Sequence, residues 1–205
     1  MMHSPQTAKT IVGQVPNDLN FAMYVASAFH ILPNLAPFSL TNLWAATTPP
    51  TISVEDQPQL MKEWEDWWHA MVLDHAQNAF RSTRETFDSA YYTPHEQFSN
   101  LSPKLQGCCQ AVFPSFHRWW TMPAGGHTAL HWLGLRVLDQ ALNVVGQGFA
   151  DPPEGYHFAV DLVYAGISDH ISVTSTYVIM SVPQVPIPTH PPAWLLAKIL
   201  GLHDE

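Results

Sequence analysis

Three histidines have the side-chain chemistry and the spacing to bind a metal ion. His127 and His131 stand four residues apart in the segment 123–148, PAGGHTALHWLGLRVLDQALNVVGQG. On a helix, residues four apart are neighbours, and the pattern places both on the apolar side. His75 lies in the apolar stripe of another predicted helix, over about 57–91. Two ligands from one helix and a third from a facing helix can hold one ion in a bundle core.

Such a site would support hydrolysis. A His/His/His site with an open position could hold Zn, Ni or Fe and activate a bound water. One histidine combined with a His-x-x-x-His pair resembles the pattern of DinB-type metal hydrolases, which are helical bundles; the resemblance covers three residues and one spacing. Asp161, Glu65 and Asp74 are candidates for a fourth ligand or a base.

The same histidines also fit a purely structural role. An imidazole on an apolar face commonly forms hydrogen bonds with a backbone carbonyl or a tyrosine, and no carboxylate lies between His127 and His131 as it does in a His-Glu-x-x-His helix. We expect this structural role, and therefore no cofactor. The divalent transition metal belongs to the alternative hypothesis.

Other residue types with catalytic potential stand in unsuitable patterns. Ser168, Asp169 and His170 are contiguous in an expected turn, where they cannot adopt the geometry of a catalytic triad. Cys108 and Cys109 are adjacent in an expected helix, so they cannot form a disulfide framework, and a small apolar packing role fits them. The sequence contains no phosphate-binding loop and no dinucleotide-binding fingerprint.

The helix that carries His127 and His131 has the clearest amphipathic pattern in the chain. At ~100° per residue, seven small or apolar residues share one face, and Trp132 falls on the other. Pro123 suits the first turn, and the glycines near the end supply a stop. The shared face consists of Leu130, Gly134, Val137, Leu138, Ala141, Leu142 and Val145.

The rest of the pattern predicts an α+β fold that is mostly helical. Further helices are expected over about 17–32, 57–91 and 103–113, with Pro114 ending the last of these, and over 193–202. Alternating apolar residues predict two strands, over 156–164 and 170–182, that form a hairpin. Because an isolated hairpin is marginal in water, a third strand is expected at 10–15 or from another chain.

These elements make a helix bundle of about five helices with one C-terminal-half β-hairpin or small antiparallel sheet. We expect one globular domain over 1–182 and a Pro-rich arm with a short terminal helix over 183–205. The anchors of that arm would be Trp194, Leu195, Ile199 and Leu202.

Composition limits the classes of partner. Only 12% of residues are charged, and the formal net charge is −9 with eight Lys plus Arg, about half the usual charged share. No basic run exists, which argues against nucleic-acid binding through a basic patch. The apolar runs are too short to span a bilayer. The N-terminus lacks the pattern of a signal peptide, and we expect an intracellular location, cytoplasmic or within an assembled particle.

Low charge, eight Trp and eighteen Pro favour surface buried against partners, since Trp is enriched at interface hot spots. The function expected first is a non-enzymatic structural or interaction subunit of a homo- or hetero-oligomeric assembly, such as a coat, scaffold or accessory subunit. The alternative is the metal-dependent hydrolase with His75, His127 and His131.

Overall fold

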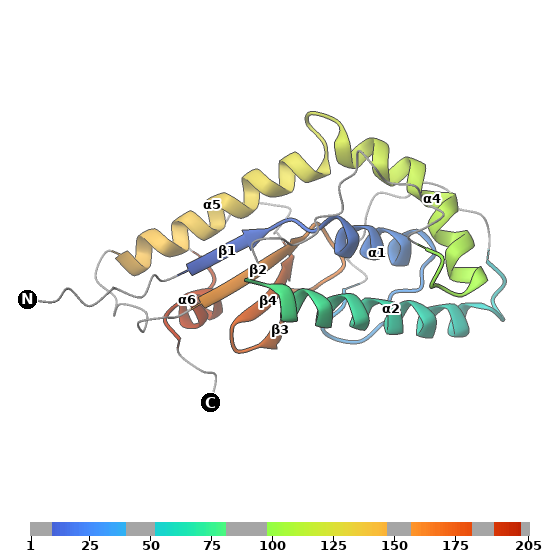
Figure 1. The fold of residues 1–205 in the computed structure, drawn as a ribbon, viewed down its shortest axis with the longest axis horizontal. Helices are drawn as coiled ribbons and strands as arrows, with labels where there is room; N and C mark the ends of the chain where they lie inside the picture. The colour runs from blue at the N-terminus through green and yellow to red at the C-terminus, as the bar shows by residue number, and fades with distance from the viewer. Residues whose placement is uncertain (1–9, 40–51, 81–97, 147–156, 182–190, 202–205) are drawn as a thin grey trace, which may run out of the picture.

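The computed structural model describes residues 10–39, 52–80, 98–146, 157–181 and 191–201. Within these residues the fold is α+β and mostly helical, with five helices and a four-stranded mixed sheet (Figure 1). No helix among them is long and apolar enough to cross a membrane. The continuation of the 57–91 helix beyond residue 80, and most of the Pro-rich stretch, lie outside the described residues.

The sheet has the strand order β1-β2-β4-β3. Its strands are β1 (Thr10–Gln14), β2 (His157–Val163), β3 (His170–Thr174) and β4 (Tyr177–Ser181). The expected third strand at 10–15 is present as β1, which pairs in parallel with β2. β2 also pairs in parallel with β4, and only β3 and β4 are antiparallel.

The predicted antiparallel sheet is therefore wrong, because the segment 170–182 forms two strands instead of one. The chain reverses at Ser175 and Thr176, where Thr174 Oγ1 accepts the backbone N–H of Thr176 at 3.2 Å. β3 and β4 make the hairpin, and β4 returns beside β2. Parallel strands covered on both faces are apolar along their whole length, and six of the seven residues of β2 are buried.

Two helices cover opposite faces of the sheet. Successive strand residues point to opposite faces: Asp161 of β2 bonds His75 of α2 (Gln57–Asn78), and Leu162 packs on Gly134 of α5 (Gly126–Gly146). A Cβ at Gly134 would lie 1.8 Å from Leu162 Cδ1. The absence of a side chain at Gly134 therefore allows β2 to pack closely on α5.

The aromatic core lies beyond the end of the sheet. α1 (Asn17–Ala28) is buried nearly all round, as its continuous apolar pattern predicts. Trp64 and Trp68 of α2 are stacked with ring centroids 5.7 Å apart, and Trp64 Nε1 donates to the carbonyl of Ala22 at 2.8 Å. Phe21 packs on Phe116 of α4 (Pro103–Thr121) with ring centroids 5.1 Å apart.

α4 (Pro103–Thr121) continues through Pro114, so the predicted end at residue 113 is wrong. Proline removes one backbone hydrogen bond and strains a helix interior. Burial of an apolar stripe on both sides of the proline offsets that cost. The stripe comprises Leu105, Cys109, Val112, Phe113, Phe116 and Trp120.

Candidate functional site

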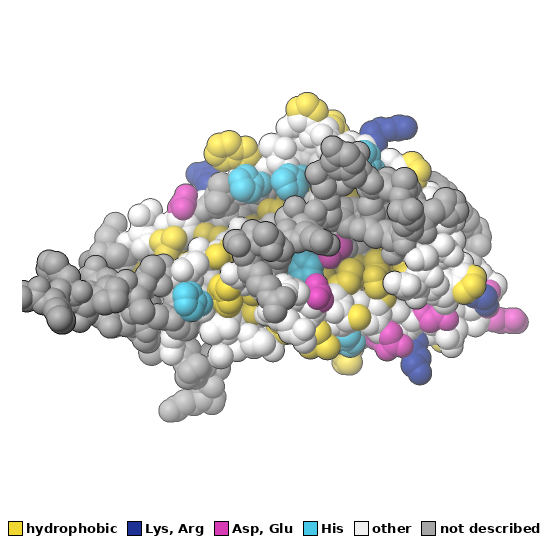
Figure 2. Space-filling model, in the orientation of Figure 1, with side chains coloured by type: hydrophobic (Ala, Val, Ile, Leu, Met, Phe, Trp, Pro, Cys, Tyr) yellow, Lys and Arg dark blue, Asp and Glu magenta, His cyan; other side chains and the backbone are white. Residues whose placement is uncertain are grey.

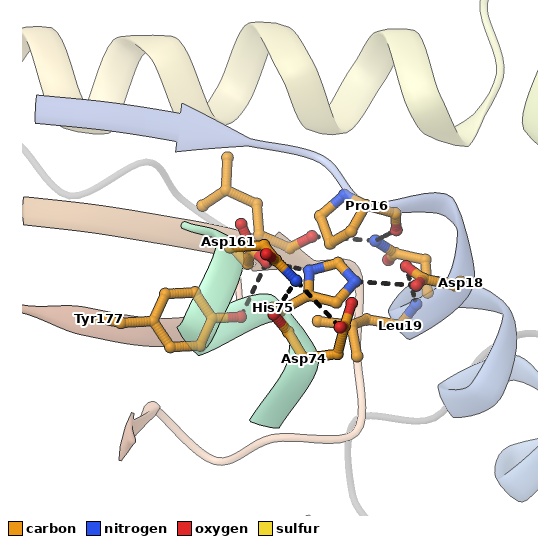
Figure 3. A network of polar contacts seen from close by, with 10 residues as sticks. Pro16, Asp18, Leu19, Asp74, His75, Asp161 and Tyr177 are labelled. Carbon is orange, nitrogen blue, oxygen red and sulfur yellow. Dashed lines mark hydrogen bonds and ion pairs between the residues drawn. The ribbon is translucent and has the colours of Figure 1, made fainter. Parts of the chain in front are cut away.

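His75, near the C-terminal end of α2, joins three elements of the fold (Figure 3). Its Nδ1 lies 2.7 Å from Asp161 Oδ2 on β2, and its Nε2 lies 2.8 Å from Asp18 Oδ2 in the first turn of α1. The Tyr177 hydroxyl of β4 donates to the same Asp161 oxygen at 2.8 Å. Asp18 Oδ1 accepts the backbone N–H of Leu19 at 2.8 Å.

Burial and charge determine the protonation of His75. Asp161 is 1% exposed and His75 is 9% exposed. Burial by itself lowers the pKa of His75, but hydrogen bonds and charge attraction from Asp161 and Asp18 outweigh it and raise the pKa to about 9. At neutral pH the imidazole is therefore a cation that donates from both ring nitrogens. It has no lone pair to bind a metal or accept a proton.

Asn20 completes the connection of α1 to the sheet. Its amide nitrogen donates to the carbonyls of Pro16 at 2.8 Å and Leu162 at 2.9 Å, and its Oδ1 accepts the N–H of Tyr164 at 2.9 Å. The side chain is fully buried. Together with the His75 cluster it fixes α1 and α2 on β2, which is a structural role.

The prediction that His75 lies on a buried stripe is confirmed. Asp161, a candidate fourth ligand or base in the sequence, is in the structure a hydrogen-bond partner of His75. The sequence did not predict that Asp18 would bond His75, or that Tyr177 would bond Asp161. The available signal was Asp161 itself, because a carboxylate in a strand buried on both faces requires a donor or a cation.

The other two candidate ligands lie elsewhere, on α5. His127 and His131 are exposed, so their predicted burial is wrong. Measured from Leu130 at about 100° per residue, His131 lies at the margin of the face that packs on the sheet. His127 is in the first turn, where its ring meets Trp120 edge to face with centroids 5.6 Å apart.

The structure thus brings His127 and His131 together, whereas His75, the third predicted ligand, has other partners. The rings of His127 and His131 are nearly parallel, with an interplanar angle of 5° and centroids 6.3 Å apart. His75 is enclosed by Asp161 and Asp18. Among the described residues, no three His, Cys, Asp or Glu side chains are grouped so that they could hold a metal ion.

The two thiols are poor nucleophiles at neutral pH. Burial, together with the charge of Glu63, raises the pKa of Cys108 to about 11. Burial also raises the pKa of Cys109, which is fully buried. Since the thiolate is the reactive form, both remain protonated. Cys108 lines a hollow of about 260 Å³ beside the ion pair of Lys104 and Asp56.

Ser168, Asp169 and His170 do not form a triad. The Ser168 hydroxyl donates to the carbonyl of Pro37 at 3.1 Å. Asp169 Oδ2 lies 3.1 Å from His170 Nδ1, and its Oδ1 accepts Trp194 Nε1 at 3.1 Å. The rings of His170 and Trp194 stack with centroids 3.9 Å apart. These residues hold the C-terminal helix against the start of β3.

That helix, α6 (Ala193–Ile199), packs within the chain. Leu195 and Ile199 are fully buried in the core, and Trp194 is partly buried against it. Three of the four predicted anchors are therefore used inside the molecule in this structure, and Leu202 lies outside the described residues. The division into a domain and an arm stays a prediction.

Comparison of the chain with protein families, curated proteins and solved structures finds no match. A function must therefore be inferred from the residues and their geometry. Among those described, His75 and Asp161 are buried and bonded to each other, while Trp132, His127 and His131 lie exposed on the surface of α5.

Proposed function

We propose that this protein is a non-enzymatic structural or interaction subunit of an oligomeric assembly, and that the outer side of α5 is its contact surface. The observation that carries the proposal is Trp132, which is 65% exposed on a helix whose opposite side packs on the sheet. An exposed Trp offers a large apolar area with few rotatable bonds, and Trp is enriched among the residues that dominate binding energy.

The surroundings of Trp132 fit a contact surface. Leu142, further along α5, is 40% exposed, and Met122, just before α5, is 47% exposed. Histidine atoms lie at the surface over α5 in Figure 2. The low charged fraction of the chain, 12%, also fits, because charged residues are depleted in the cores of interfaces.

The polar clusters support a binding role over catalysis. His75 is held as a cation by two carboxylates, and Asp161 is almost inaccessible to solvent. Both thiols are protonated at neutral pH. The metal-dependent hydrolase receives less support, because His75 has Asp161 and Asp18 as partners while the other two histidines lie on the surface of α5.

The proposal is tested by replacing Trp132 with Glu and measuring association by sedimentation velocity over a range of concentrations. We expect a weaker oligomer with an unchanged helical spectrum, because Trp132 is exposed. The matched control is Leu73→Glu, which places a carboxylate at a 57% exposed position on α2. Equal association of the two variants and the wild type would contradict a role for α5.

A further inference from the structure

His127 and His131 form a pair of imidazoles on the surface of α5. They are four residues apart, both are exposed, and their rings lie nearly parallel with centroids 6.3 Å apart. The ring of His127 contacts the core through Trp120, which it meets edge to face. The buried cluster around His75 is made with Asp161 and Asp18 and does not include this pair. The pair is thus accessible to a small solute from solvent.

Imidazole is the side chain that Zn²⁺, Ni²⁺ and Cu²⁺ share as a preferred ligand. Metal–nitrogen bonds of about 2.0–2.1 Å place two ligand nitrogens of one ion roughly 3 Å apart. The present ring separation is longer, but residues four apart on a helix have Cβ atoms only about 5–6 Å apart. Rotation of two exposed side chains about their χ angles can therefore bring both nitrogens to one ion without moving the backbone.

The local electrostatics also suit a neutral ligand. Metal binds imidazole only in its neutral form. Burial, and to a smaller extent the neighbouring His131, lower the pKa of His127. The lowered pKa favours the neutral, metal-binding form of His127 at pH 7, in contrast to His75.

We propose that His127 and His131 chelate one divalent transition-metal ion, of the Zn²⁺, Ni²⁺ and Cu²⁺ class, at the exposed surface of α5. Two imidazoles fill half of a tetrahedral shell, and water completes it. This site differs from the predicted three-histidine site, because His75 is bonded to two carboxylates. It shares the outer side of α5 with the proposed contact surface, but metal binding by the separate chain does not require association.

The test is isothermal titration calorimetry of the full-length, untagged protein with ZnCl₂ at pH 7.5, supported by NMR of the histidine rings. We expect one ion per chain, bound more tightly than by a single imidazole, and zinc-dependent shifts of the two α5 imidazoles. Replacing His131 with Ala should weaken binding at least about tenfold, because a chelate becomes a single ligand. His69→Ala, at an exposed position on α2, is the matched control and should bind as the wild type does.

A second variant separates spacing from the number of histidines. In the double variant His131→Ala/Asn143→His, two exposed histidines remain on α5, but 16 residues or about 24 Å apart. It should bind as weakly as His131→Ala. Wild-type affinity in either variant, or no stoichiometric binding by the wild-type protein, would overturn the proposal.

Discussion

Replacing His75 with Gln probes the most polar part of the core. The change removes the cation between Asp161 and Asp18 and leaves Asp161, which is 1% exposed, with the Tyr177 hydroxyl as a remaining donor. Removing one partner of a buried charge pair costs about 3–5 kcal/mol because the other charge stays buried. We expect a loss of that size in the free energy of unfolding at pH 7.

The effect of pH on the wild type has a definite sign. The pKa of His75 is raised from 6.5 to about 9 in the folded protein. Each tenfold change in proton affinity is worth about 1.4 kcal/mol, so the protonated imidazole contributes about 3 kcal/mol of stability. Because the folded pKa is the higher one, this contribution is complete below pH 6.5 and is lost as pH rises through 9.

Urea unfolding followed by tryptophan fluorescence at pH values from 6 to 10 measures both effects. The difference in stability between wild type and His75→Gln should be largest near pH 6 and should shrink as pH approaches 10. His69→Gln on the same helix is the control, since His69 is exposed. A loss below about 1 kcal/mol at pH 7, or the same pH dependence in wild type and His75→Gln, would refute the reasoning.

Four further changes test other parts of the fold, each by urea unfolding. Asn20→Ala should lose at least about 2 kcal/mol, since it removes three hydrogen bonds that a fully buried amide makes to the backbone; full stability would contradict the role given to this amide. Gly107→Ala should gain up to about 1 kcal/mol, because nothing lies within 4 Å of the new Cβ in α4. Gly125→Ala should destabilise, because its Cβ would lie 2.0 Å from a backbone oxygen; the same sign for both glycines would be inconsistent with this packing. Trp194→Ala should lose about 1–3 kcal/mol with its stacking and hydrogen bond, and unchanged stability would argue against docking of α6 within the chain.

Local periodicity predicted the elements better than their partners. The apolar side of α5 was predicted at Leu130, Val137 and Ala141, which are buried, and Trp132 was correctly placed outside. Leu142, predicted on the buried side, is 40% exposed. The sheet covers a narrower band of α5 than the pattern suggested, and for the same reason His131 at the margin is exposed.

Long-range pairing could not be predicted from the pattern. His75 and Asp161 are 86 residues apart in sequence, and neither position indicates the other. The turn at Ser175 and Thr176 has no Gly or Pro to mark it, so β3 and β4 appeared as one strand. Pro114 has the opposite effect: its local rule predicts a helix end, but burial of Phe113 and Phe116 overrides it.

The most direct test of the interaction function is the mass of the untagged wild-type protein in solution. Size exclusion with multi-angle light scattering reports this mass without assuming a shape. The proposal predicts a defined species larger than the 23.0 kDa chain. A monomer of 23.0 kDa at every accessible concentration would contradict self-association through α5.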